Sequence, residues 1–272
     1  MKKRNLKNLT VIILLILGAV DFYFRDSEYS VTGMVIGNFN YENGIKIANW
    51  NLQIFGVSKA SDEELMNFYA DKINNYDIIF IQEIRDESGT AFEKLCSLLD
   101  EYNCEISSRA GRTSSKEQYG VIYNKSIKLN YLKDYNPDKQ NRWERPPIEA
   151  NFDLNNYNLT IFNIHVKPDD VQNELDYLDD VALNKGYTLV NGDLNADCNY
   201  YNNAVENEFE KWSWIINDNE DTTSGDSNCA YDRIITSSLL KDKVVRYGID
   251  KEVNKEQSDH YLIWVELRQE ID

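Results

Sequence analysis

The sequence predicts one α/β domain built on packed β-sheets. Short apolar runs with the length and composition of strands recur from residue 45 onward, and amphipathic helical segments separate several of them. Many strands with a few interspersed helices are typical of sheets that helices cover. Neither an internal repeat nor a low-complexity linker follows residue 45, so residues 45–269 are expected to fold as a single domain.

The first elements alternate between strand and helix. The segments IKIANW (45–50) and YDIIFIQE (76–83) have the apolar character of buried strands. Residues 61–76 between them form an amphipathic helical pattern, and Ser61 with Glu64 three residues later is expected to open it as a capping box.

The rest of the chain continues this alternation and is richer in strands. The pattern predicts a helix over 89–102, strands over 118–124, 127–132, 148–154 and 158–166, a helix over 169–185, and strands over 186–193, 231–236, 242–248 and 261–267.

Composition supports a folded core and restricts the class of function. Hydrophobic residues make up 42% of the 272 residues and aromatic residues 12%, so the chain is not of the disordered type. Acidic residues outnumber basic ones 46 to 29, giving a net charge of −17. This balance argues against holding nucleic acid by broad phosphate neutralisation. It is compatible with an enzyme that contacts nucleic acid through a local basic patch and bound cations.

The N-terminus has the pattern of a targeting segment. MKKRNLKN is basic, and LTVIILLILGAV then forms an apolar run that is shorter than the roughly 20 residues of a membrane span. Residues 1–24 are therefore expected to be a signal peptide or, since no small-residue cleavage site follows, an N-terminal membrane anchor. A buried N-terminal helix is the alternative. Residues 25–44 would be a linker, and the protein would be secreted or anchored on the outer face of the membrane.

Export changes the interpretation of the four cysteines. Cys198 and Cys229 stand in polar loops, and Cys96 and Cys104 flank the segment SLLDEYN. Neither pair has the spacing of a zinc site. Disulfides are favoured outside the cytoplasm, although the sequence leaves open whether Cys96 and Cys104 are joined.

Polar side chains stand at the ends of six strand-like segments. One such residue alone is usually a turn former. Their joint occurrence predicts a site at one edge of the sheets, where acid/base and cation-binding groups meet. These residues are Asn51, Gln82 and Glu83 followed by Arg85, His165, Asp193 with Asn195, Asp232, and Asp259 with His260.

At these positions the chain resembles the DNase I-like members of the endonuclease/exonuclease/phosphatase superfamily. The motifs that carry the resemblance fall in order over residues 45–267: ANWNLQIFG, IIFIQEIRD, GRTSSKEQYG, FNIHVKP, LVNGDLNADCNY, SNCAYDRI and SDHYLIWVEL. The resemblance implies a four-layered sandwich of two packed mixed β-sheets flanked by helices. It also implies hydrolysis of DNA phosphodiesters with divalent cations.

The resemblance also assigns roles to residues. Glu117 would pair with His165 and Asp232 with His260, and imidazole suits acid/base work because it titrates near neutrality. We take His260 as the base and His165 as the acid, with the reverse left open. Glu83 and Asp259 would bind Mg²⁺ or Mn²⁺, and Asn51, Asp193 and Asn195 would lie near the scissile phosphate or a second ion.

The resemblance also implies DNA contacts and a second cation. Arg85, Arg112 and Arg145 would face the substrate, with a solvated face as the alternative for arginines in these segments. Asp221 and Thr223 match the family's structural Ca²⁺ loop, for which a plain polar turn is the alternative. The cysteine pair Cys198 and Cys229 matches the family's bridge.

Two residues depart from the family's pattern. Ser115 stands where the family has a tyrosine that packs into the minor groove, and Gln53 replaces an arginine. Both changes remove DNA contacts and leave the acid/base residues in place, so weaker or altered sequence preference is expected.

The leading hypothesis is a secreted or membrane-anchored, metal-dependent endodeoxyribonuclease of low sequence specificity. It would act on DNA as a monomer without an obligate protein partner. Two alternatives are a phosphoesterase of the same superfamily that acts on a lipid or inositol-phosphate headgroup, and a catalytically silent binding protein on this scaffold. The retained histidines argue against the silent protein.

Overall fold

The computed structural model describes residues 44–113, 115–202 and 208–269. The segment expected to be a signal peptide or anchor, and all but the last residue of the linker, lie outside these ranges. None of the helices in the described ranges combines the length and the apolar character that a membrane crossing requires.

The first sheet has six strands in the order β11-β12-β1-β2-β4-β3. Strands β1 and β2 run parallel at its centre, and every other neighbouring pair is antiparallel. The strands are β1 (Gly44–Phe55), β2 (Ile78–Ile84), β3 (Tyr102–Ile106), β4 (Gln118–Asn124), β11 (Val244–Asp250) and β12 (Leu262–Arg268).

The second sheet also has six strands, in the order β5-β6-β7-β8-β10-β9. Its central pair, β7 and β8, is again parallel, and the other pairs are antiparallel. The strands are β5 (Lys128–Asp134), β6 (Ile148–Asp153), β7 (Asn158–Asn163), β8 (Tyr187–Asp193), β9 (Ser213–Trp214) and β10 (Asp232–Thr236).

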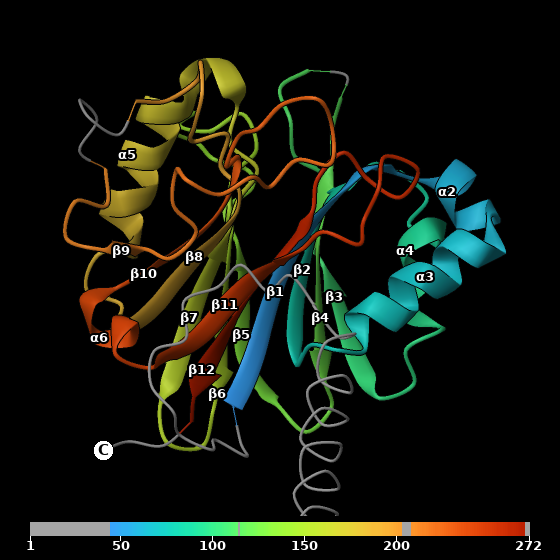
Figure 1. The fold of residues 1–272 in the computed structure, drawn as a ribbon, viewed down its shortest axis with the longest axis horizontal. Helices are drawn as coiled ribbons and strands as arrows, with labels where there is room; N and C mark the ends of the chain where they lie inside the picture. The colour runs from blue at the N-terminus through green and yellow to red at the C-terminus, as the bar shows by residue number, and fades with distance from the viewer. Residues whose placement is uncertain (1–43, 114, 203–207, 270–272) are drawn as a thin grey trace, which may run out of the picture. The chain divides into compact units, whose positions relative to one another are not determined.

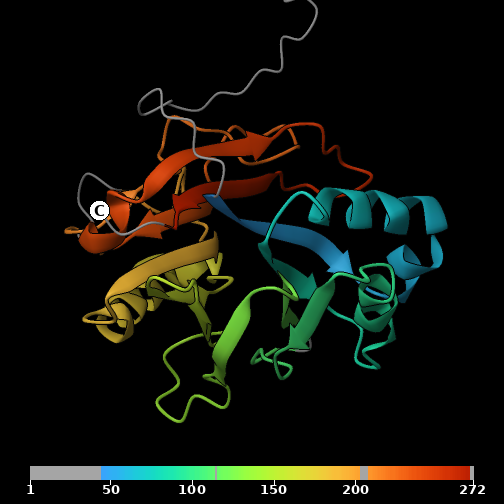
Figure 2. The same ribbon diagram turned by 90° about the horizontal axis from the view of Figure 1, so that it is seen from below.

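Helices cover the outer faces of both sheets. In Figures 1 and 2, helices α2 to α4 lie on one side of the sandwich and α5 lies on the other. The expected four-layered sandwich is confirmed. The helices are α2 (Val57–Ser61), α3 (Glu63–Ile73), α4 (Thr90–Cys96), the 3₁₀ turn η1 (Pro168–Asp170), α5 (Val171–Ala182) and α6 (Ser238–Lys241).

Three apolar layers follow from the two-residue period of the strands. Ile45 and Ile47 of β1 point between the sheets, whereas Ala48 and Trp50 point to the helices. The inter-sheet layer also contains Phe80, and the layer between the second sheet and α5 is built by residues such as Phe162. Alternate side chains of one strand thus enter two different cores, which explains the nearly continuous apolar runs of the central strands.

Local details of the first helical region differ from expectation. The capping-box prediction is wrong: Ser61 ends α2, and its hydroxyl donates to the Ser58 carbonyl. Asp62 caps α3 instead, accepting from the amide of Leu65 at 3.0 Å. A carboxylate beside Ser61 competes for the same amides at the helix N-terminus, and here it satisfies one of them.

Some predicted boundaries also change. The helix expected over 89–102 ends at Cys96, and residues 102–106 pair with β4 as the edge strand β3. Edge strand β3, the two-residue strand β9 and the short helices α2 and α6 have no counterpart among the predicted elements. Such short elements bury few side chains and leave little periodicity to detect.

Two disulfides link loops and elements. Cys96 at the end of α4 is bonded to Cys104 of β3, with 6.3 Å between their Cα atoms. Cys198, after β8, is bonded to Cys229, just before β10, with 5.9 Å between their Cα atoms. The second bond therefore ties together the loops that flank two strands of the second sheet.

Gly192 is required by a close approach of backbones. Its φ is +145°, and a Cβ atom there would lie 2.0 Å from the Ile164 carbonyl oxygen of the neighbouring strand.

We expect Gly192→Ala to destabilise the protein by roughly 3 kcal/mol, since strain at this φ and overpacking against backbone both contribute. Urea unfolding followed by tryptophan fluorescence measures this. Gly186→Ala is the control, because Gly186 has φ +79° with open space around it. Equal losses in the two variants would contradict the packing argument.

Candidate active site

The inward-facing row of each central strand changes from apolar to polar toward one edge of the sandwich. On β7 the row runs through Ile161 to Asn163 and then to His165 just beyond the strand. On β8 it runs through Leu189 and Asn191 to Asp193. Each step is two residues, so the strands' own period delivers an amide and then an ionisable group to the same edge.

The amides form a buried layer that joins the two sheets. Asn163 of the second sheet donates to the Oδ1 atoms of Asn49 in the first sheet, at 2.7 Å, and of Asn191, at 2.9 Å. Gln82 of β2 donates to the Ile164 carbonyl at 2.7 Å and accepts from the Asp193 amide at 2.8 Å. The four amide side chains are completely buried. They hold the backbone on which His165 and Asp193 stand.

His260 and Asp232 form one histidine–carboxylate pair. Nδ1 of His260 lies 2.7 Å from Oδ2 of Asp232, which is completely buried. Burial alone would lower the pKa of His260, but the charges of Asp232 and Asp193 outweigh it and raise that pKa above its ordinary value. The carboxylate therefore orients the ring and increases its basicity, leaving Nε2 directed away from Asp232.

His165 and Glu117 form the second pair. Nδ1 of His165 lies 3.1 Å from Oε1 of Glu117, and the Arg145 Nε lies 2.7 Å from the same oxygen. Burial would raise the pKa of Glu117, but His165, Arg145 and Arg85 outweigh it and lower the pKa to about 2. Burial likewise opposes the charged form of His165, and Glu117 nevertheless raises its pKa.

The two pairs converge on one carboxylate. Oδ2 of Asp193 lies 3.3 Å from Nε2 of His165 and 3.5 Å from Nε2 of His260. The Nε2 atoms of both rings thus lie next to one side chain, and each ring is held at Nδ1 by its own carboxylate. This arrangement brings two acid/base groups close enough together to act on one reacting group.

Oxygen donors surround the same point. Nδ2 of Asn51 lies 3.2 Å from Glu83 and 3.1 Å from Asp193, so the two carboxylates flank one amide. Asp259 accepts from Gln53 at 2.8 Å through Oδ2, and its Oδ1 is buried without a hydrogen-bond partner. The nearest cationic group to that oxygen is Nε2 of His260, at 3.9 Å. Clustered carboxylate and amide oxygens, with one oxygen left without a hydrogen bond, fit a hard divalent cation such as Mg²⁺ or Mn²⁺.

Strained backbone shapes this donor cluster. Strand β1 has a register irregularity between Asn51 and Phe55, where Gln53 and Ile54 have φ of 47° and 56°. Glu83 opposite has φ of 59°, and its carboxylate accepts from the Ile54 amide at 2.9 Å. Positive φ is unfavourable for these side chains and is concentrated here at the candidate site. The irregularity re-aims the strand end toward the donors.

The arginines expected to face substrate are engaged with the protein. Arg145 is largely buried, and besides Glu117 it contacts the carbonyls of His165 and Val166. Arg85 pairs with Glu83 at 3.1 Å and lies 3.9 Å from Glu117. Arg112 donates to the carbonyls of Asn141 and Trp143, away from the histidines' partners. Their placement as DNA contacts stays a prediction.

The remaining predicted residues lie close by or in an adjacent loop. Asn195 is buried and donates through Nδ2 to the Val166 carbonyl at 3.0 Å. Oδ1 of Asp221 accepts from the Thr223 amide at 3.1 Å and from its hydroxyl at 2.9 Å. These latter bonds are those of a polar turn, which is stable without an ion. Binding of a structural Ca²⁺ by this loop stays a prediction.

Several supporting residues were not predicted from the sequence. Asn163 and Asn191 complete the amide layer around Gln82, which the sequence had already placed at a strand end, and the Tyr119 hydroxyl accepts from the His165 amide at 3.1 Å. A signal for the amides was present, because each interrupts an apolar run at an inward position. The tyrosine carries no such signal, since its hydroxyl acts from a strand of the other sheet.

Comparison with known proteins identifies the family. A sequence model of the Endonuclease/Exonuclease/phosphatase family matches residues 48–260, which include both histidine–carboxylate pairs. The chain belongs to the Endonuclease/Exonuclease/phosphatase family. Deoxyribonuclease-1 of Bos taurus is 31% identical over 260 residues, covering 82% of this chain and 92% of that protein. Deoxyribonuclease-1 of Homo sapiens matches with the same identity and coverage.

Solved structures of the family share the fold. A mannosyl-6-phosphatase from Bacteroides thetaiotaomicron superposes with a TM-score of 0.61 at 16% identity, over 82% of this chain and 99% of that chain. D. rerio TDP2 complexed with a single-strand DNA product gives 0.61 at 14% identity, over 84% and 100%. At these identities the likeness concerns the fold alone. The family match and the relatives together confirm that the chain is a DNase I-like member and a metal-dependent phosphodiesterase.

Glu117 gives a pH-dependent prediction. Its folded pKa of about 2 lies below its ordinary value of 4.5. Folding therefore favours its ionised form. This stabilisation, about 3 kcal/mol, is complete above pH 4.5 and is lost as the pH falls toward 2. We expect Glu117→Gln to lower the free energy of unfolding at pH 6 and to flatten its dependence on pH between 4.5 and 2.5. Urea titrations in EDTA measure both effects. Glu87→Gln, which removes an exposed carboxylate, is the control. Parallel pH curves for wild type and Glu117→Gln would contradict the assignment.

Proposed function

We propose that this protein is an exported, metal-dependent endonuclease that hydrolyses DNA phosphodiester bonds with low sequence specificity. The observation that supports it best is the convergence of the two histidine–carboxylate pairs on Asp193, at 3.3 Å and 3.5 Å. Hydrolysis of a phosphodiester requires a base for the attacking water and an acid for the leaving oxygen, and two opposed imidazoles supply both.

In the proposed reaction, His260 takes a proton from water through Nε2 while the water oxygen attacks phosphorus. Asp232 holds the ring and stabilises the imidazolium that results. His165, charged through its contact with Glu117, gives its Nε2 proton to the oxygen that leaves when the phosphorus–oxygen bond breaks. A divalent cation, when bound, neutralises charge on the phosphate oxygens.

The cation would be Mg²⁺ or Mn²⁺. Glu83 and Asp259 would be its ligands, with Asn51, Asp193 and Asn195 close to the phosphate or to a second ion. Hard oxygen donors in this number are the reason for the choice. A structural Ca²⁺ would be held by the loop of Asp221 and Thr223, beside the Cys198–Cys229 disulfide.

DNA as substrate is supported by the two deoxyribonucleases that are about 30% identical to this chain. Low sequence specificity is supported by Ser115 and Gln53, whose short or uncharged side chains offer little for reading bases. Arg85, Arg112 and Arg145 would act near the phosphates. Two disulfides in the described chain suit secretion or anchoring outside the cytoplasm, where the protein would work as a monomer.

Plasmid nicking tests this function. We expect the full chain to nick supercoiled plasmid with Mg²⁺ and Ca²⁺ and to be inactive in EDTA. His165→Ala and His260→Ala should each lower the rate by roughly 10²- to 10⁴-fold, because each removes one proton-transfer group. A folded, disulfide-intact wild type that leaves plasmid intact would refute the proposal. Phospholipid and inositol-phosphate hydrolysis would then be measured.

A modified substrate separates the acid from the base. Where sulfur replaces the leaving oxygen of one phosphodiester, the departing thiolate needs no proton. On this substrate we expect His165→Ala to recover to within about tenfold of wild type, while His260→Ala stays impaired, since only the acid becomes dispensable. Single-turnover cleavage rates provide the measurement. Recovery of His260→Ala alone would show that the two roles are the reverse of those proposed.

A further inference from the structure

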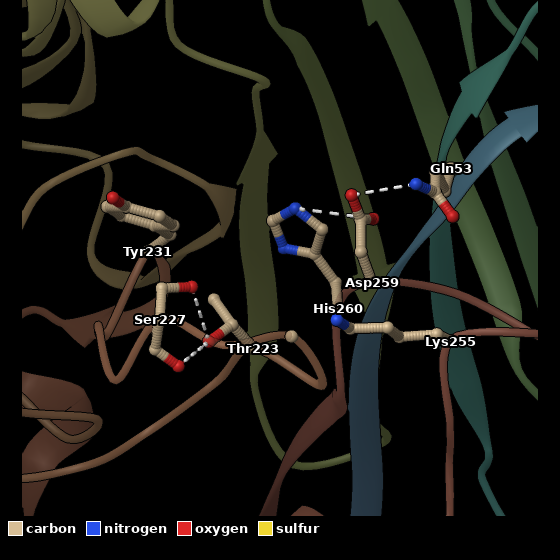
Figure 3. Close-up of a pocket in the computed structure, with 8 residues that line it drawn as sticks. Gln53, Thr223, Ser227, Tyr231, Lys255, Asp259 and His260 are labelled. Carbon is tan, nitrogen blue, oxygen red and sulfur yellow. Dashed lines mark hydrogen bonds and ion pairs between the residues drawn. The ribbon is translucent and has the colours of Figure 1, made fainter.

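A polar pocket opens beside His260. Its volume is about 390 Å³, and it is lined by residues of two loops, between β9 and β10 and between β11 and β12, and by Gln53 near the end of β1. Figure 3 shows Lys255 extending beneath His260, with Tyr231 and Ser227 across the pocket from it. Asp259 and Gln53 form the wall toward the proposed cation ligands. Because His260 is part of its lining, the pocket adjoins the position of the proposed cleavage.

Lys255 supplies the ammonium group of this pocket. The arginines near the histidines are already compensated: Arg85 by Glu83, and Arg145 by Glu117. In contrast, the Lys255 side chain is 57% exposed, and it stands in a protein whose net charge is −17. An exposed amine next to the cleaved bond is suited to a phosphate of the substrate chain.

The partner of Lys255 is a weak competitor. Its Nζ lies 3.3 Å from Oδ1 of Asp226, whose side chain is fully exposed. The two residues come from different loops, 224–228 and 251–258, on either side of the pocket. An ion pair between solvated side chains contributes roughly 0–1 kcal/mol. A phosphate therefore displaces Asp226 at little cost.

We propose that Lys255 is a substrate-affinity residue, whose ammonium binds a backbone phosphate flanking the cleaved bond, and that Asp226 competes with that phosphate. The proposal rests on the proposed DNA-cleaving function. The Lys255 ammonium would then provide local positive charge at the site of an acidic protein. Asp226 would set the fraction of Lys255 side chains that are free to bind phosphate.

The test uses steady-state cleavage of plasmid by the full chain at fixed Mg²⁺ and varied NaCl. We expect Lys255→Gln to raise KM for DNA on the order of threefold to tenfold with little change in kcat, because one phosphate contact is lost. The slope of log(kcat/KM) against log[NaCl] becomes less negative by about 0.9. Lys255→Arg keeps both parameters near wild type.

The competition is tested by a double-mutant cycle. Asp226→Asn is expected to lower KM about twofold in the wild-type background, in keeping with a weak exposed pair. In the Lys255→Gln background the same substitution has no effect, because the amine it would release is gone. A general change in the protein's field would instead lower KM in both backgrounds, and that result would overturn the competition.

Lys128 and Asp153 provide matched controls. They form a similar exposed pair, 3.6 Å apart, that joins β5 to β6 away from the pocket. Lys128→Gln and Asp153→Asn should leave KM and the salt slope unchanged. If Lys255→Gln has the same KM and salt slope as Lys128→Gln, the assignment of Lys255 fails while the nuclease function stands. The same holds if Lys255→Gln lowers kcat without raising KM. Failure of the function itself is recognised separately, since the wild type then leaves plasmid intact.

Discussion

The catalytic edge depends on one constraint, the layer of buried amides between the sheets. Asn49 and Gln82 belong to the first sheet and Asn163 and Asn191 to the second, and none reaches solvent. Nδ2 of Asn191 is the one amide nitrogen of the four that has no hydrogen-bond partner. A buried amide without partners is costly, so the hydrogen bonds among these four side chains restrict the register in which the sheets can pack. That register also determines where His165 and Asp193 stand. The geometry of the site is therefore set by the amides buried beneath it, which do not contact substrate.

Sequence periodicity was sufficient for the central strands and for the polar residues at their ends, because a two-residue period and an abrupt change to His or Asp are local signals. It failed where neighbours compete or where contacts are remote. Asp62 replaced Ser61 as a cap, and edge strand β3 lies just beyond the helix predicted over 89–102, where no predicted strand covers it. The pairing of Glu117 with His165 came from resemblance, since the two stand on different sheets. The Tyr119 contact with the His165 amide had no signal at all.

Charge illustrates the difference between counting residues and placing them. In the sequence, Arg85 and Arg145 add to a basic group for DNA; in the fold, they compensate Glu83 and Glu117. This compensation allows a buried carboxylate to stay ionised behind His165, which burial alone would oppose. Basic residues near a nuclease site can thus either bind DNA phosphates or compensate buried carboxylates, and the number of basic residues in the sequence does not distinguish these roles. Burial separates them, because an internal arginine is committed to its carboxylate.

Each histidine–carboxylate pair spans the sandwich. Glu117 immediately precedes β4 of the first sheet and meets His165 from the second, whereas Asp232 begins β10 of the second sheet and meets His260 just before β12 of the first. Any fluctuation that separates the sheets breaks both pairs together. The integrity of the site is therefore coupled to the packing of the two sheets, so a stress that loosens the sandwich disables both histidine–carboxylate pairs at once.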